Sequence, residues 1–195
     1  IGQIKEFFPT SEHKNVVICT SSIGDNHFSS LIVDSIPDLH TIATTQCFPL
    51  YWYDDSNADI VDLFSQGLDN KIDKYTRKDG VTDWILTQCR KQYGYKTQIT
   101  KEDIFYYVYG ILHSPDYRST FEADLKKMLP RLPLVESKEE FFAFSNAGRK
   151  LAELHLNYET IEPYGKCEIE FAPFTDKGGT DMNYRVEKMR FGKID

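Results

Sequence analysis

The chain has 195 residues, of which 41% are hydrophobic and 14% aromatic, and its formal net charge is −7. This is enough apolar material for the core of one domain, and no run approaches the ~20 apolar residues of a membrane-spanning helix. The four cysteines include no C-x-x-C pair, which argues against a zinc or redox motif and favours buried free thiols in a reducing cytoplasm. The negative net charge counts against nucleic-acid binding unless cations gather locally.

The first part of the chain, residues 1–55, is predicted to be β-rich. Residues 15–20 form a continuous apolar run, which is typical of a buried strand. After a polar loop, residues 29–33 return to apolar character. Residues 46–53 are aromatic and strand-like, but Pro49 cannot donate a hydrogen bond to a sheet and restricts this segment to an edge strand or a bulge.

Residues 54–80 are predicted to form an acidic and polar surface segment, with one short helix at 60–64. A metal site built from its aspartates is the alternative, but a solvated acidic face is the simpler interpretation. The aspartates concerned are Asp54, Asp55, Asp59, Asp62, Asp69 and Asp73.

The middle of the chain, residues 100–158, is predicted to be helical. Thr100 can cap a helix with an apolar stripe, and Ser114-Pro115 ends that helix and begins the next, which gives a helical hairpin over 101–129. Ser137, followed three residues later by a glutamate, forms a capping box for a further helix. In one alternative, a break at 145–148 divides this last helix into two.

Residues 165–195 are predicted to be β-rich again. The fold class is therefore α+β: a β-rich N-terminal part, a central helical hairpin and further helix, and a β-rich C-terminal part. The order of strands, helices and strands differs from the regular alternation of a doubly wound fold.

The sequence contains no recognisable catalytic motif. It has no G-x-x-x-x-G-K-[ST] phosphate loop, no G-x-S-x-G elbow and no H-E-x-x-H, so neither catalytic residues nor metal ligands are predicted. Lys166, Glu168 and Glu170 could be arranged as a nuclease site, but a half-exposed strand accounts for their alternation more simply.

Three groups of polar or basic residues are candidates for DNA contacts. Side chains of the loop at 21–30 can donate to or accept from base edges, and two basic stretches could follow phosphates. An ordinary solvated surface is the alternative for each. The candidates are Ser22, Asp25, Asn26, His27 and Ser29 in the loop, the weaker basic set Lys74, Arg77 and Lys78, and Arg185, Lys188 and Arg190 near the C-terminus.

Three longer stretches are similar to one known family. Residues 46–51 (Q-C-F-P-L-Y), 99–115 (I-T-K-E-D-I-F-Y-Y-V-Y-G-I-L-H-S-P) and 144–159 (F-S-N-A-G-R-K-L-A-E-L-H-L-N-Y-E) resemble, in order and spacing, the C-terminal specificity domain of type ISP restriction-modification enzymes. Because these motifs are mostly apolar and helical, they suit the scaffold, and residues that contact bases are expected in the loops between them.

The resemblance implies a DNA target-recognition domain within a larger cytoplasmic enzyme. In this family a single polypeptide joins a nuclease, an ATP-driven translocase (helicase) and an adenine-specific DNA methyltransferase to the specificity domain. We expect double-stranded DNA and the methyltransferase and helical domains of the same polypeptide as partners, and no membrane.

The resemblance also implies which activities this chain lacks and where the domain ends. The fragment itself is expected to be non-catalytic and free of cofactors, while the parent would use ATP, Mg and S-adenosylmethionine. The chain begins at Ile1 and ends soon after a motif at 184–191 that continues in the family, so residues 1–195 are expected to be a fragment truncated at the C-terminal end. The alternative function is a structural domain that docks the methyltransferase to the motor with little DNA contact.

Overall fold

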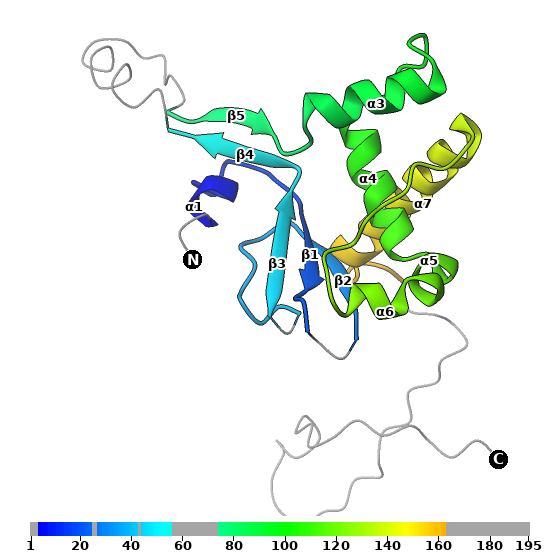
Figure 1. Cartoon of the computed structure of the whole chain (residues 1–195). Coiled ribbons are helices and arrows are strands. Elements are labelled where there is room, and N and C mark those ends of the chain that lie inside the picture. The colour runs from blue at the N-terminus through cyan, green and yellow to red at the C-terminus, as the bar shows by residue number, and fades with distance from the viewer. Residues whose placement is uncertain (1–3, 25–26, 43, 56–73, 163–195) are drawn as a thin grey trace, which may run out of the picture. The chain divides into compact units, whose positions relative to one another are not determined.

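The computed structural model describes residues 4–24, 27–42, 44–55 and 74–162. The predicted helix at 60–64 and the predicted strands of 165–195 lie outside the described residues. All elements among the described residues belong to one compact unit, Ile1–Ile161 (Figure 1). Its small antiparallel sheets and its helices confirm the predicted α+β class.

The first sheet has three antiparallel strands in the order β2-β1-β3. The strands are β1 (Val17–Ser21), β2 (Ser30–Val33) and β3 (Thr45–Pro49). All five residues of β1 are buried, because this central strand is covered on both faces. The segment 46–53, predicted as one strand, is divided between β3 and a separate strand at 51–54. Pro49 is the last residue of β3, an edge strand as predicted, so its missing N–H interrupts no ladder.

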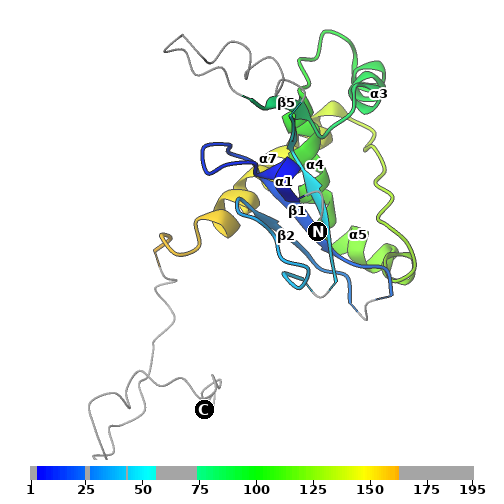
Figure 2. The same cartoon turned by 90° about the vertical axis from the view of Figure 1, so that its left-hand side faces the viewer.

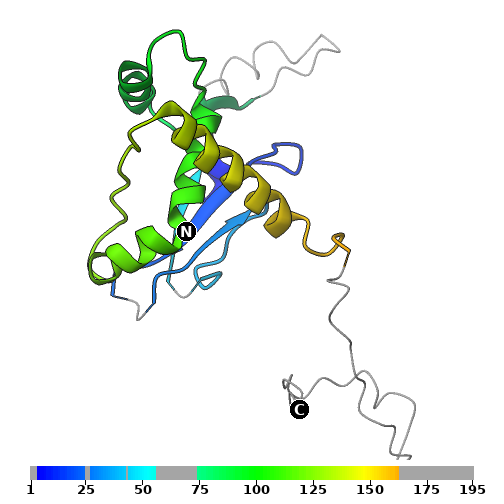
Figure 3. The same cartoon turned by 90° about the vertical axis from the view of Figure 1, so that its right-hand side faces the viewer.

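The alternation of side chains along β1 divides the core into two clusters. Ile18 packs with Ile32 of β2 on the face covered by helices α4 (Lys101–Leu112) and α7 (Lys138–Leu156). These two helices lie behind the sheet in Figure 2 and in front of it in Figure 3. Val17 and Cys19 point to the other face, where they pack with Phe7 of α1 (Ile4–Phe7).

The described cysteines are free thiols, as predicted. Cys19 lies opposite Cys47 in the β1–β3 register, although the two are far apart in the sequence. Burial, and secondarily the neighbouring Cys47, raises the pKa of Cys19 to about 12. The Cys19 thiol is therefore protonated at neutral pH and is a poor nucleophile.

A second sheet is the hairpin of β4 (Tyr51–Asp54) and β5 (Thr76–Asp79). Strand β5 is not predicted from the sequence, because its residues T-R-K-D lack the apolar alternation that predicts a strand. The buried side chain of Asn15 ties the hairpin to the first sheet. Its Nδ2 donates to the carbonyls of Phe7 (3.0 Å) and Tyr51 (2.6 Å), and its Oδ1 accepts from Val16 and Tyr51.

The helix caps follow the sequence prediction. Thr100 forms a capping box with Asp103, and Ser137 forms one with Glu140. Ser114 caps the next helix, with Pro115 at its first position. The remaining helices are α3 (Asp83–Tyr93), which the sequence analysis did not predict, α5 (Pro115–Thr120) and α6 (Glu122–Leu125).

The main helix packing differs from the predicted hairpin. α4 crosses α7, which is distant in sequence, and the segment after Pro115 turns away as two short helices broken at Phe121 (Figure 3). The prediction of a single helix for the second half of the hairpin over 101–129 was therefore wrong. α7 is continuous through 145–148, so the predicted alternative of a break there was wrong. Gly148 is instead the residue at which α7 meets the backbone of α4.

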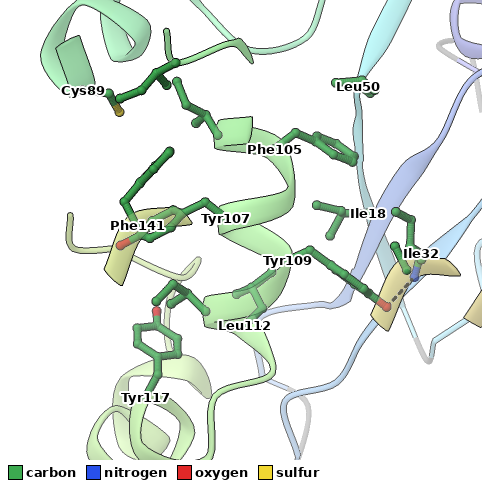
Figure 4. Packing of buried hydrophobic residues seen from close by; sticks show 14 of the residues in the cluster. Ile18, Ile32, Leu50, Cys89, Phe105, Tyr107, Tyr109, Leu112, Tyr117 and Phe141 are labelled. Atoms are coloured by element: carbon green, nitrogen blue, oxygen red, sulfur yellow. Dashed lines mark hydrogen bonds between the residues drawn. The ribbon is translucent and has the colours of Figure 1, made fainter. Parts of the chain in front are cut away.

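Buried tyrosines account for much of the aromatic content. Figure 4 shows Tyr107 stacked on Phe141, with ring centroids 4.7 Å apart, and the hydroxyl of Tyr109 bonded to the backbone N–H of Ile32. The Tyr107 hydroxyl donates to the carbonyl of Pro133 (2.6 Å) and so holds the extended connection before α7 against α4. Each buried phenol thus has a hydrogen-bond partner, which satisfies its polar end.

Candidate nucleic-acid interface

Three predicted cations gather on the β4–β5 hairpin. Each lies near an aromatic ring, so that the hairpin presents cations on an aromatic support. The pairs are Arg77 on Tyr51 at 4.3 Å, Lys78 on Trp52 at 4.7 Å and Lys74 near Tyr75 at 5.8 Å, measured to the ring centroids.

Arg77 is the best placed of the three for an anion. The Tyr51 hydroxyl donates to a carboxylate oxygen of Glu102 at 2.6 Å, which fixes the ring on which the guanidinium lies. Burial, and then Glu102, raises the pKa of Tyr51 to about 12, so the phenol keeps this proton at neutral pH. Arg77 is exposed, and within the described part of the chain no carboxylate forms an ion pair with it. Its planar fork is therefore available for a bidentate contact with a phosphate.

Two other cations of this region, Lys78 and Lys101, already have carboxylate partners. Lys78 forms an ion pair with Asp54, and Lys101 pairs with Asp79 (2.8 Å) and Asp83 (2.7 Å). Exposed ion pairs of this kind contribute little net stability, because water screens them. Lys78 can therefore exchange Asp54 for a phosphate oxygen at little energetic cost.

The loop between β1 and β2 holds the second predicted group. His27 and Ser29 are exposed, and the Ser22 hydroxyl accepts from the Gln46 amide at 3.4 Å. The base of the loop is closed by Ser21, whose N–H donates to the Ser29 carbonyl and whose Oγ accepts from the Ser29 N–H, both at 3.0 Å. Asp25 and Asn26 lie outside the described residues.

The structure does not bring the loop and the hairpin together. The loop follows Ser21 at one end of β1, whereas the hairpin is joined to the other end, where the Leu50 N–H donates to the Val16 carbonyl. A strand of this length spans about 17 Å, so the two groups would contact different parts of a duplex. The third group, Arg185, Lys188 and Arg190, lies outside the described residues.

Two cations beside the loop were missed by the sequence analysis. Arg118 of α5 lies over the Phe28 ring at 5.6 Å, and the carbonyl of Lys126, directly after α6, accepts from the Gly24 N–H at 3.0 Å. The Ser114-Pro115 signal locates α5 in the sequence, but only the tertiary fold places it beside residues about 90 positions earlier.

Within the described ranges, no group of three or more His, Cys, Asp or Glu side chains is arranged to hold a metal ion. No helix among the described residues is both long enough and apolar enough to cross a membrane.

Comparison with solved structures identifies similar folds in proteins solved with DNA or a DNA mimic. A DrdV–DNA complex has 32% identity and a TM-score of 0.66 over 83% of this chain. The ATP-dependent Type ISP restriction-modification enzyme LlaBIII bound to DNA has 30% identity and a TM-score of 0.64 over 82% of this chain. A nuclease-deletion mutant of the Type ISP enzyme LlaGI, in complex with a DNA substrate mimic, has 30% identity and a TM-score of 0.60 over 83%.

The similarity covers only a small part of each of these proteins, namely 14%, 9% and 12% of their chains. No curated protein matches the sequence. The family model described as the Type ISP C-terminal specificity domain matches residues 2–195. The chain therefore belongs to the family of Type ISP C-terminal specificity domains.

Proposed function

We propose that this chain is the DNA target-recognition domain of a larger Type ISP restriction-modification enzyme. The observation that carries the proposal is its family membership together with its similarity, over most of its length, to proteins solved with DNA. The β4–β5 hairpin supplies the physical means, because Arg77 is exposed, held on the Tyr51 ring and free to bind a phosphate.

Local charge matters here because the chain as a whole carries a net charge of −7. Phosphate contacts fix the position of a protein on the duplex, and contacts with base edges give the sequence preference. In this proposal the hairpin makes phosphate contacts, and the loop with His27 and Ser29 is the first candidate for base contacts.

In this proposal, catalysis belongs to other domains of the parent protein. Cleavage, translocation and adenine methylation, with their ATP, Mg and S-adenosylmethionine, would belong to other domains of the same polypeptide, and this domain would select the site. Base methylation requires the target base to leave the stack, so a recognition domain would act together with a neighbouring methyltransferase domain. We further infer a cytoplasmic location, where such an enzyme meets DNA.

The test is a binding measurement on the full-length parent protein with a panel of duplexes at low and high salt. Arg77→Ala should weaken binding about equally across sequences and reduce the slope of log K against log[salt] by about 1. The matched control is Lys150→Ala, which removes one exposed cation from α7. The proposal would be contradicted by binding that does not depend on salt, or by equal effects of the two substitutions.

Docking between the methyltransferase and the motor is the second candidate. The segment 101–129 no longer supports it, since most of α4 is buried in the core of this domain. A different observation favours it: Trp84 at the start of α3 is 69% exposed, and Tyr95 just beyond α3 is 73% exposed. Large exposed aromatic side chains are typical of protein contacts. If Trp84→Ala preserves site binding but uncouples DNA binding from translocation, α3 is a docking surface.

A further inference from the structure

A hollow of about 340 Å³ lies beside the β1–β2 loop, away from the hairpin. Its lining joins His27 and Phe28 of the loop to Arg118, Glu122 and Lys126 of the α5–α6 segment. The hollow therefore mixes aromatic, basic and acidic groups, which distinguishes it from the apolar packing of the core.

The α5–α6 segment holds the loop from both sides. The Gly24 N–H donates to the Lys126 carbonyl at 3.0 Å, and the Arg118 guanidinium lies over the Phe28 ring. Gly24 has a φ of 95°, a conformation that side chains rarely adopt, so this anchor favours glycine. The two anchors fix Gly24 and Phe28 of the loop, and a ligand in the hollow would lie next to Phe28, which lines it.

Arg118 is held in place by the end of α4. Its Nε–H donates to the Leu112 carbonyl at 2.6 Å, and one Nη lies 3.4 Å from Nδ1 of His113. A guanidinium has five N–H donors, so these two contacts leave others for a ligand. Because its position is already fixed, Arg118 would lose little side-chain entropy on binding an anion.

The charge of Arg118 is not balanced locally. Its side chain is half-buried, and among the described residues no carboxylate lies within ion-pair distance of it. A partly desolvated cation without a counter-charge is unfavourable in the free protein, and an anion beside it removes that cost. Lys126 adds a second cation to the same hollow, where it pairs with Glu122 at 2.8 Å.

We propose that this hollow binds a phosphate group of the DNA backbone, with Arg118 and Lys126 as donors. The assignment rests on the proposed function and adds a second phosphate contact at the opposite end of β1 from Arg77. It fixes the DNA backbone next to the loop and so positions His27 and Ser29 against the base edges. Lys126 exchanges Glu122 for the phosphate, and this exposed i,i+4 pair is weak because water screens it.

Glu122 should affect DNA binding in the opposite direction to Lys126. Its carboxylate lines the hollow and repels a phosphate that enters it. Glu122→Gln should therefore strengthen DNA binding by about threefold, whereas Lys126→Ala should weaken it by about fivefold and reduce the salt slope by about 1.

The experiment measures duplex binding of the full-length parent protein against salt, with Lys127→Ala as the matched control. Lys127 is the exposed neighbour of Lys126 and does not line the hollow, so its loss should leave both affinity and salt slope unchanged. Arg118→Gln is a further variant, and its unfolding is measured in parallel because Arg118 also holds the end of α4.

The outcomes separate this inference from the proposed function. If Arg77→Ala weakens binding while Lys126→Ala matches Lys127→Ala and Glu122→Gln has no effect, the hollow is not a DNA contact and the proposed function stands. If the wild-type protein shows no salt-dependent binding, both fail. Inorganic phosphate at matched ionic strength is the second probe: if it binds through Lys126 at millimolar concentration without displacing DNA, the site is one for free phosphate and the assignment to DNA is overturned.

Discussion

Replacement of Gly148 by alanine tests the close crossing of α4 and α7 on which the core depends. A Cβ on Gly148 would lie 2.0 Å from the Tyr106 carbonyl oxygen and 2.9 Å from the Gly110 backbone nitrogen. The first distance is about 1.4 Å shorter than the 3.4 Å at which ordinary contact begins. Both obstacles are backbone atoms of α4, so no side-chain rotation relieves the clash and the helices must separate.

Two opposing effects determine how much Gly148→Ala lowers the free energy of unfolding. Alanine is a better helix former than glycine by about 1 kcal/mol. Overpacking a well-packed core costs about 1–3 kcal/mol, and a clash between two helix backbones belongs at the upper end of that range. We expect Gly148→Ala to lower the free energy of unfolding by about 2 kcal/mol.

The assay is urea unfolding of the chain followed by circular dichroism. Ala147→Gly is the matched control, because Ala147 is the exposed neighbour of Gly148 and reports helix propensity alone. That control should lower the free energy of unfolding by about 1 kcal/mol. If Gly148→Ala is as stable as the wild type, or more stable, the close crossing is refuted.

Three further predictions follow from buried polar groups. Asn15→Leu should lower the free energy of unfolding by about 3 kcal/mol in urea, because it leaves buried backbone groups of Phe7 and Tyr51 without partners; a loss below about 1 kcal/mol would contradict the role of Asn15 as the tie between the sheets. Tyr109→Phe should cost about 1–2 kcal/mol in the same assay, since the hydroxyl accepts from the Ile32 N–H and contacts His155 Nδ1, and an unchanged midpoint would refute this. Burial, and then the charges of Arg118 and His155, lower the pKa of His113 to about 4 from 6.5. The unfolded state therefore binds more protons than the folded state between pH 4 and 6.5, and stability that is complete above pH 6.5 should fall by up to about 3 kcal/mol as the pH drops through this window. His113→Gln should flatten that dependence, and an unchanged profile would show that other groups cause it.

The predictable parts of the fold are those with strong local signals. Thr100, Ser114 and Ser137 are side-chain caps whose geometry depends on the next few residues, and all three were predicted correctly. The buried strand β1 was also predicted correctly, because a central strand covered on both faces is continuously apolar in sequence.

The missed parts depend on contacts between distant residues. Strand β5 is polar and exposed, and it is held by pairing with β4 rather than by apolar alternation. Gly148 was interpreted as a possible helix break, since a sequence pattern cannot show that α4 approaches at that point. Arg77 was selected from its charge alone, whereas its support by Tyr51 and Glu102 requires the folded structure.

The most direct test of the central claim is to map the DNA sequence methylated by the parent enzyme after this domain is exchanged. Residues 1–195 are replaced by the matching domain of another family member with a different target, and methylated adenines are located by sequencing. If this chain is the target-recognition domain, the methylated sequence changes to that of the donor. If the enzyme stays active and methylates its original sequence, recognition resides elsewhere and the account is contradicted.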